Sequence, residues 1–515
     1  MKHKIQAILS LLLISLQAFA DNGMEYGADI RANAGSGNFA PSLIMANRDG
    51  KVTQPDGIAL SAHLRRSLDL SRRFDYGFGG EITGQWTKPT SYMRYNAADA
   101  AWEVNRQRPG AFVLQSLWGE VKFRGVFLTA GMKPNDRSLF DSSLASGDIT
   151  LSRNARPVPQ VRAGFIDFQN VPFTRGWLQI QGELAYGKFA DSNWLRNHYN
   201  YYNDFITTGA WMHYARLYFR SDPHRRLSVT IGMQHAAQFG GEYTYYFRGK
   251  TDTHRKDKIS LKTFFDVMIP RRDGSGPNAG DQAYYTGNHL GSWDLLATYR
   301  FRDNSTLTFS WQSPWEDGSG IGKLNGFDGV YSLEYRFREG FPIRAARFEY
   351  LDFRNQSGPI HWAPGDHAGT GMTGEATGND DYYNNFNFNG WANYGQSLGT
   401  PFLPGPIFNR NGTLAFLDNR IYGFHAGVEA EPMEGLSCRV LFEWRRSAGR
   451  YYRPRLKKRE SVSMLFGGEY KIKNVKGLSA TLDVAFDSGS LLGAKCGIMA
   501  GVQYNGSLSF RSRKN

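Results

Sequence analysis

Residues 331–338 read YSLEYRFR and alternate between apolar and polar side chains along their whole length. One face carries Tyr, Leu, Tyr and Phe, and the other carries Ser, Glu, Arg and Arg. A period of two is that of a β-strand and not of an α-helix. The stretches LQIQGEL (178–184) and LSVTIGMQ (227–234) repeat the pattern. Such strands fit the wall of a membrane β-barrel, whose outer face meets lipid and whose lumen is polar.

The segments between the predicted strands are of two lengths, and these lengths alternate along the chain. Short turns are predicted at 71–73, 124–125, 171–176, 222–226, 303–305, 339–342, 432–435 and 474–477. Long loops are predicted at 87–111, 133–160, 190–209, 239–289, 313–328, 355–419, 447–459 and 488–495. Outer-membrane barrels have short periplasmic turns and long extracellular loops in this alternation, whereas a soluble β-sandwich has no reason to place its long loops on one side.

The number of predicted strands suits a closed barrel. With a first strand at 25–35 and a last strand at 496–510, the chain holds about 18 strands, an even number that leaves both termini in the periplasm. The predicted fold class is therefore an all-β, antiparallel, outer-membrane barrel that forms one domain over 21–515. The weakest strand predictions are the first strand and 160–169. We assign 258–270 to a long loop, with a strand and an inward-folded segment as alternatives.

The N-terminus predicts export. Residues 1–20 combine a basic start, an apolar run and the sequence Ala-Phe-Ala, so we expect a signal peptide that is cleaved between Ala20 and Asp21. No later apolar stretch reaches the ~20 residues of a membrane helix, and the mean hydropathy is −0.48. Aromatic residues make up 14% of the chain and glycine occurs 58 times, a composition that fits barrel strands. The expected location is the outer membrane of a gram-negative bacterium.

The two cysteines are expected to be free thiols. In the predicted topology Cys438 follows a short turn and Cys496 follows a long loop, so the two lie at opposite rims of the barrel. A disulfide requires Cα atoms within about 7 Å of each other, which this arrangement prevents.

No sequence motif indicates an enzyme. The chain contains no G-x-S-x-G, HExxH or P-loop sequence, and its 11 histidines show no metal-ligand spacing. Glu81, Glu183, Glu334 and Asp483 are expected to face the lumen, where pairing with basic residues is a simpler role than catalysis. We therefore expect a protein without enzymatic activity, cofactor or bound metal.

Residues 445–459 form a basic segment, RRSAGRYYRPRLKKR, that the topology places outside the cell. Fixed positive charge with neighbouring tyrosines attracts anionic polymers. Phosphates of outer-leaflet lipopolysaccharide are an equal alternative, and a solvated loop tip is the third. The candidate polysaccharide contacts are Arg445, Arg446, Arg450, Arg453, Arg455, Lys457, Lys458 and Arg459.

The longest loop, 355–419, contains NDDYYNNFNFNGWANYGQ (379–396), in which rings and amides stand side by side. Rings stack on the C–H faces of sugars, and amides bind hydroxyl groups. The alternative is that the loop packs on itself and closes the barrel as a plug. The candidate sugar contacts are Asp381, Tyr382, Tyr383, Asn384, Asn385, Trp391 and Tyr394.

Several stretches resemble the Wzi family of capsule assembly proteins. They are EYGADIRANAGSGNFAPSLIMANRDG (25–50), GELAYGKFADSNWL (182–195), ITTGAWMHYARLYFR (206–220), SVTIGMQHAAQFGG (228–241), NDDYYNNFNFNGWANYGQSLGTPFL (379–403) and NRIYGFHAG (419–427). The resemblance implies an outer-membrane barrel of about 18 strands that binds capsular polysaccharide in a lectin-like, non-enzymatic way and is occluded.

The expected partners follow from export, the formal charge of +14 and this resemblance. They are surface polysaccharide, outer-membrane lipid with lipopolysaccharide, and the barrel-insertion machinery, for which an aromatic near the chain end such as Phe510 is a typical signal. We expect a monomer and no nucleic-acid partner. The alternative function is a porin-like diffusion channel for small polar or anionic solutes, because most strands have a polar face.

Overall fold

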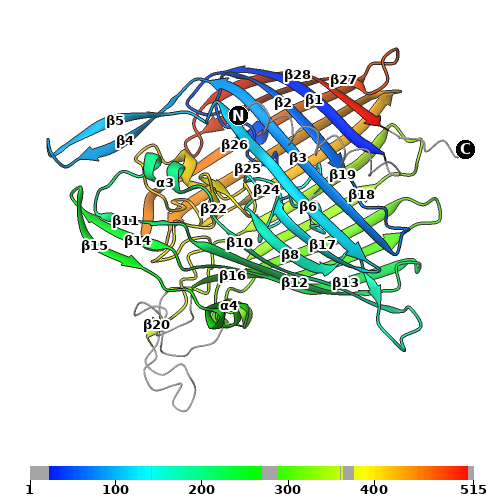
Figure 1. Cartoon of the computed structure of the whole chain (residues 1–515), viewed down its shortest axis with the longest axis horizontal. Helices are drawn as coiled ribbons and strands as arrows, with labels where there is room; N and C mark the ends of the chain where they lie inside the picture. The colour runs from blue at the N-terminus through cyan, green and yellow to red at the C-terminus, as the bar shows by residue number, and fades with distance from the viewer. Residues whose placement is uncertain (1–22, 141, 270–286, 360, 363–375, 509–515) are drawn as a thin grey trace, which may run out of the picture.

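The structure is a computed structural model that describes residues 23–140, 142–269, 287–359, 361–362 and 376–508. The predicted signal peptide, its cleavage site between Ala20 and Asp21, and Phe510 lie outside these residues. The described chain forms a closed barrel (Figure 1). Closure comes from the first strand, which pairs antiparallel with both the second and the last, in register from Met24 opposite Leu508 to Gly35 opposite Gly497.

The barrel has 18 antiparallel strands, as the sequence predicted. The segments β8 and β9 both pair with β10 and act as one interrupted strand. The wall consists of β1 (Met24–Gly35), β2 (Gly57–Arg66), β3 (Phe74–Thr87), β6 (Phe112–Phe123), β7 (Val126–Met132), β8 (Gln160–Phe165), β9 (Gln169–Asn170), β10 (Leu178–Lys188), β12 (Trp211–Ser221), β13 (Leu227–Phe239), β16 (Asn288–Arg300), β17 (Thr306–Trp315), β18 (Gly329–Arg336), β19 (Ile343–Asp352), β24 (Ile421–Met433), β25 (Leu436–Arg450), β26 (Arg453–Lys471), β27 (Leu478–Gly489) and β28 (Lys495–Leu508).

The predicted alternation of strand faces is confirmed in β18, which contains the first six residues of the YSLEYRFR stretch. Ser332 and Glu334 are buried toward the lumen, while Leu333 points outward and is 49% exposed. Exposed aliphatic side chains recur on the outer face of the other strands, for example Ile30 and Leu60. A continuous apolar exterior is stable only against lipid, so this face is the membrane-facing belt.

Short turns gather at one rim of the barrel and longer connections at the other, which we call the short-turn rim and the long-loop rim. The predicted long loop at 447–459 is wrong. β25 continues to Arg450 and β26 begins at Arg453, so the two strands form a hairpin with Tyr451 and Tyr452 at its tip. The strands can extend past the wall because they continue to pair with each other, as Ser447 does with Arg459. The predicted loop at 488–495 is also short, because only 490–494 separate β27 from β28.

The other elements lie within the connections at the long-loop rim, several of them projecting beyond the barrel (Figure 1). They are α2 (Ser42–Met45), β4 (Thr90–Asn96), β5 (Ala101–Gln107), α3 (Ser192–His198), β11 (Asp204–Thr208), β14 (Glu242–Phe247), β15 (Lys250–Lys256), α4 (Leu261–Met268), α6 (Gly318–Ile321), β20 (His361–Trp362), β21 (Ala376–Thr377), β22 (Ala392–Asn393), β23 (Gln396–Ser397) and η1 (Pro406–Phe408). Among the described residues, no helix combines the length and the apolar character needed to span a bilayer.

Residues 258–270 were expected to be a long loop, a strand or an inward-folded segment. Over its described part this segment instead contains helix α4, which begins after Ser260. The Ser260 hydroxyl accepts from the Thr263 backbone N–H, and the Thr263 hydroxyl accepts from the Ser260 backbone N–H, which makes a capping box. The Ser260–Thr263 capping box is therefore a local helix signal in a chain whose wall strands follow a period of two.

The carboxylates expected in the lumen are paired with cations. Glu183 lies 3.4 Å from Arg216, Glu334 lies 3.0 Å from Arg347, and Asp483 lies 2.5 Å from Arg48. Glu81 forms a fourth pair with Lys51 at 2.5 Å. Cys438 lies near the short-turn rim and Cys496 near the long-loop rim, and neither forms a disulfide.

Candidate functional site at the long-loop rim

The lumen is filled by three connections, 36–56, 133–159 and 378–420, which together we call the plug. Plug residues form one apolar core with inward-facing wall residues; for example, Trp391 and Phe402 cluster with Met212 and Leu351. A second core joins Ile44 and other α2 residues to the opposite wall. The barrel is therefore occluded in this structure by its own connections.

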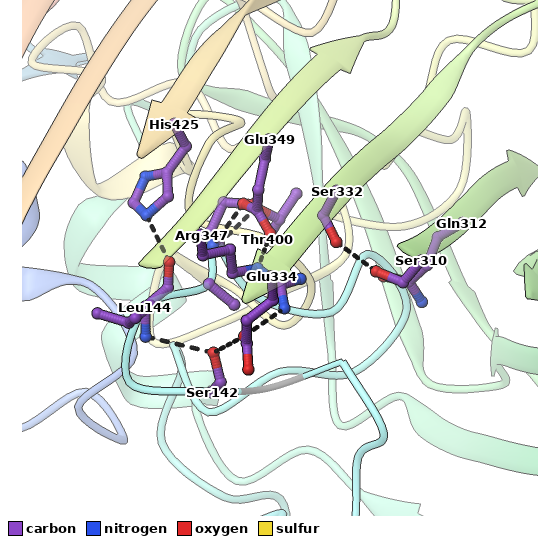
Figure 2. Close-up of polar contacts among 12 residues, drawn as sticks. Ser142, Leu144, Ser310, Gln312, Ser332, Glu334, Arg347, Glu349, Thr400 and His425 are labelled. Carbon is purple, nitrogen blue, oxygen red and sulfur yellow. Dashed lines mark hydrogen bonds and ion pairs between the residues drawn. The ribbon is translucent and has the colours of Figure 1, made fainter. Parts of the chain in front are cut away.

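Polar contacts also hold the plug to the wall (Figure 2). His425 of β24 donates to the Leu144 carbonyl at 3.1 Å, and the Ser142 hydroxyl donates to Glu334 of β18 at 3.5 Å. The plug is internally bonded as well, because the Thr400 hydroxyl donates to the Ser146 carbonyl at 2.8 Å. These bonds satisfy polar groups that burial would otherwise leave without partners.

Three rings of the 379–396 stretch, those of Tyr382, Tyr383 and Trp391, lie inside the plug. Trp391 is 0% exposed, and its indole N–H donates to the Thr150 carbonyl at 2.7 Å. The Tyr382 hydroxyl donates to Asp328 at 3.1 Å, and burial raises the pKa of Tyr382 well above its ordinary value. The Tyr383 hydroxyl donates to the Ile149 carbonyl. These three rings have no open face in this structure.

The polar candidates of the same stretch are also engaged inside the protein. Asn384 exchanges hydrogen bonds with the backbone of Phe416 at 2.9 and 2.8 Å. Asp381 is buried and accepts from Asn419 at 2.8 Å, while Asn385 donates to Asn288 of β16 at 3.1 Å. Of the seven residues proposed from this stretch, Tyr394 alone lines the open pocket described below.

The basic residues of 445–459 lie on the β25–β26 hairpin, which we call the basic hairpin, and they divide into two sets. Three arginines point inward: Arg445 donates to the Phe402 carbonyl at 3.0 Å, Arg450 pairs with Asp381, and Arg455 donates to Asp418 at 2.6 and 2.8 Å. They fix the plug and are not available to a ligand in this structure. The second set remains at the rim: Arg446 is half-buried, and Arg453, Lys457, Lys458 and Arg459 are exposed.

An open pocket of about 420 Å³ lies at the long-loop rim between the β4–β5 hairpin, helix α3 and the plug. It combines four aromatic rings, a set of side-chain amides and basic groups. No acidic residue is among its described lining residues. The residues that carry this chemistry are Lys51, Gln54, Gln85, Tyr92, Gln107, Arg108, Phe112, Gln115, Arg156, Asn193, Trp194, Asn197, Tyr394 and Gln396.

Trp194 is held as a rigid platform at this pocket. Its ring stacks on His198 with centroids 4.5 Å apart and planes 15° apart, and His198 in turn meets Tyr92 edge-on at 4.4 Å. Burial lowers the pKa of His198 to about 3, so the imidazole is neutral at physiological pH. The Tyr92 hydroxyl donates to the Ile407 carbonyl at 3.2 Å and fixes the end of the stack.

Arg156 supplies a partly buried cation to the same pocket. It donates to the Leu114 carbonyl at 2.6 Å, and its guanidinium carbon lies 4.6 Å from the centroid of the Tyr394 ring. Burial lowers the pKa of Arg156. No ion pair joins Arg156 to a carboxylate of the described chain. The charge is therefore oriented and free to meet an anion.

The pocket was not found from the sequence, because its residues come from connections that are far apart in the chain. Trp194 and Asn193 belong to the GELAYGKFADSNWL stretch (182–195), whose tryptophan in a polar context was a usable signal. Arg156 and Gln54 have no neighbouring motif. Only the packing of the plug against α3 brings these side chains together.

A second set of residues also converges unexpectedly. His213, His235 and His289 come from β12, β13 and β16, and the His235 and His289 ring nitrogens lie 2.8 Å apart. Strand pairing brings these histidines together although they are distant in sequence, so their spacing along the chain did not indicate this proximity. Within the described ranges, however, no three His, Cys, Asp or Glu side chains are arranged to hold a metal ion.

Two adjoining cavities of about 420 and 440 Å³ lie in the lumen on the short-turn side of the plug. They share Arg48, Ser143 and Arg439 among their lining residues. Charges of both signs line the first of these cavities, for example Asp29 and Arg31. This polar vestibule would be needed by a channel, but the plug closes it toward the long-loop rim.

Comparison with known proteins shows the fold. No protein-family model matches the chain, and no curated protein matches it by sequence. Among solved structures it is similar to Wzi of Escherichia coli, an outer-membrane protein involved in group 1 capsule assembly and described as a carbohydrate-binding β-barrel. The TM-score is 0.57 at 13% identity, over 98% of this chain and 88% of that one.

Other outer-membrane barrels superpose less well. OccAB4 of Acinetobacter baumannii has a TM-score of 0.44 at 9% identity, over 95% of this chain and 99% of that one. OprD of Pseudomonas aeruginosa has a TM-score of 0.42 at 10% identity, over 96% of this chain and 98% of that one. At 13% identity, the likeness to Wzi shows a shared fold, the outer-membrane β-barrel, and not a shared ligand.

Proposed function

We propose that this chain is a non-enzymatic outer-membrane protein that binds a capsular or other surface polysaccharide and supports its assembly or attachment at the cell surface. The observation that carries the proposal is the rim pocket, where Trp194 and Tyr394 stand among amides and basic groups. Rings stack on sugar C–H faces, amides bind hydroxyls, and guanidinium groups bind carboxylates in a directed way.

The position of the pocket supports the same function. Long loops of outer-membrane barrels face the cell exterior, where polysaccharide is found. Occlusion by the plug suits a binding protein, which needs a rigid surface and not a path through the membrane. The fold shared with a carbohydrate-binding barrel agrees with this proposal, as do the sequence stretches that resemble the Wzi family.

The direct test uses the purified protein in detergent and the capsule of the strain that encodes it. We expect the protein to retain this polysaccharide, and deletion of the gene to release capsule from the cell surface. Failure of both binding and release would contradict the proposal. A neutral glycan such as dextran is the control for non-specific retention.

Binding should weaken with salt. The pocket presents Arg108 and Arg156 and no acidic lining residue, whereas Lys51 is paired with Glu81. An anionic polysaccharide therefore gains electrostatic attraction from the two arginines. Raising the ionic strength from about 0.1 M to about 1 M shortens the Debye length from about 10 Å to about 3 Å and should lower the affinity. The affinity can be measured by titration calorimetry at each salt concentration. An affinity that does not change would show that charge has no part in recognition.

The second candidate function is a porin-like diffusion channel, and the polar vestibule under the plug favours it. Conductance across a planar bilayer separates the two functions. A plugged binding protein should give no steady open-channel current, because the plug core excludes water and ions. Large, stable currents from the wild-type protein would instead support the channel.

A further inference from the structure

Helix α4 lies against the outside of the barrel at the long-loop rim (Figure 1). Its Phe264 ring packs on Trp211, Phe239 and Tyr186, with centroids 5.4, 5.4 and 5.1 Å away. The Tyr186 hydroxyl also donates to the Phe264 carbonyl at 2.7 Å. The inner side of the helix, including the fully buried Val267, is thus docked onto three strands of the wall.

Strand alternation shows that this docking surface is the membrane-facing side of the wall. Met212 and Ala185 belong to the lumenal core, so their neighbours Trp211 and Tyr186 point outward. Gln238 donates to the Gly390 carbonyl of the plug, so Phe239 also points outward. The three rings lie at the long-loop ends of β10, β12 and β13, which is the level where the outer-membrane apolar belt meets the headgroups.

The side of α4 that faces away from the barrel is apolar, and no described residue covers it. Leu261, Phe265 and Ile269 are 81%, 66% and 51% exposed. Their spacing of four residues places them on one stripe of the helix. Lys258 is exposed just before the helix, and Lys262 lies on its first turn with an ion pair to Asp266. An apolar stripe with adjoining lysines matches a helix that lies in a membrane interface.

Next to the helix, three histidines interrupt the apolar outer face of the wall. His213, His235 and His289 alternate with lumenal residues, so they point outward, yet each is at most 9% exposed. Tyr186 packs on His213 at 4.9 Å, and Phe264 of α4 packs on Tyr186. Imidazoles are costly in contact with lipid. If a bilayer lies on this side of the wall, a helix at this position is needed to keep the imidazoles away from lipid.

We propose that α4 is an interfacial anchor whose Leu261–Phe265–Ile269 stripe inserts among the lipids of the outer leaflet. The lipid is its one occupant, because the stripe continues the membrane-facing belt of β12 and β13, where Leu217 and Ile231 are exposed. Lys258 then lies at the level of the lipid phosphates. The anchor fixes the barrel's height at this sector of the rim and shields the histidines below it.

The test is a nitroxide spin label at position 265. Cys438 and Cys496 are first changed to serine, and the full-length Phe265→Cys variant is labelled and reconstituted into phosphatidylcholine vesicles. Collision with oxygen, which concentrates in lipid, is compared with collision with a water-soluble nickel chelate. Phe265 is mostly exposed on the protein surface, so the substitution should leave folding intact.

Two matched positions calibrate the result. Ile231 is 53% exposed in the middle of the membrane-facing belt, so a label on Ile231→Cys should collide mainly with oxygen in lipid. Val104 is 60% exposed on β5 beyond the barrel, so a label on Val104→Cys should collide mainly with the nickel chelate in water. We expect position 265 to resemble position 231, with oxygen collisions exceeding nickel collisions. A label at 265 that behaves like the label at 104 would overturn the proposal. Strong spin–spin coupling between molecules would also overturn it, because a second copy of the chain would then cover the stripe.

Discussion

Changing Arg156 to glutamine is expected to weaken polysaccharide binding more than any other single charge removal at the rim. Arg156 is oriented by the Leu114 carbonyl and the Tyr394 ring and has no carboxylate partner in the described chain. A hydrogen bond to a charged group contributes about 1.5–3 kcal/mol, which corresponds to a loss of affinity of roughly 10- to 150-fold. Calorimetric titration with capsule oligosaccharide measures the change.

The matched control for this prediction is Arg453→Gln at the basic hairpin, where the arginine is exposed. Removing either arginine lowers the net charge by the same amount, but Arg453 lies outside the pocket. Equal losses for the two variants would show that general attraction, and not the pocket, binds the polymer. Trp194→Ala is an independent test of the pocket. The loss of polysaccharide affinity in this variant should persist at high salt if the ring stacks on sugar.

Replacing Trp391 with alanine should destabilise the plug strongly. The ring is fully buried between the plug and the wall, and the substitution both removes its hydrogen bond to Thr150 and leaves a cavity. Truncation of a buried tryptophan costs about 3–5 kcal/mol. We expect earlier thermal unfolding of the protein in detergent, together with transient openings in planar bilayers that the wild-type protein does not show.

Trp102→Ala is the control for the plug prediction, because Trp102 lies on β5 and is 45% exposed. It removes the same side chain without creating a closed cavity, so the thermal transition should hardly move. If Trp391→Ala left both the transition and the conductance unchanged, the 378–420 segment would not be what closes the barrel. This outcome would leave the rim pocket and its ligand untouched.

The barrel wall could be predicted from the sequence because its information is local. In YSLEYRFR the polarity of each residue predicts whether its side chain faces the lumen or the lipid. The short turns predict where the chain reverses direction. The same local reading failed at 447–459. A segment with eight basic residues was predicted to be a long extracellular loop that contacts polysaccharide or lipid phosphates, whereas three of its arginines bind inside the protein, to the carbonyl of Phe402 and to Asp381 and Asp418.

The candidate site, unlike the barrel wall, could not be predicted from local sequence. The stretch NDDYYNNFNFNGWANYGQ was correctly singled out as unusual, but composition alone left sugar binding and self-packing open. Most of its rings pack inside the plug, Phe386 is exposed, and Tyr394 and Gln396 line the pocket. Trp194, Arg156 and Gln54 are separated by long stretches of chain, so no window of sequence contains the pocket.

What the sequence determined by itself is the transmembrane wall: strand periodicity, the alternation of turn lengths and the even strand number follow from neighbouring residues and a lipid exterior. What only the tertiary structure decided is everything that the wall surrounds or carries, including the plug, the rim pocket, the histidine group and the docking of α4. These features depend on contacts between connections whose ends the barrel brings together, and the free energy of such contacts is not encoded in any one segment.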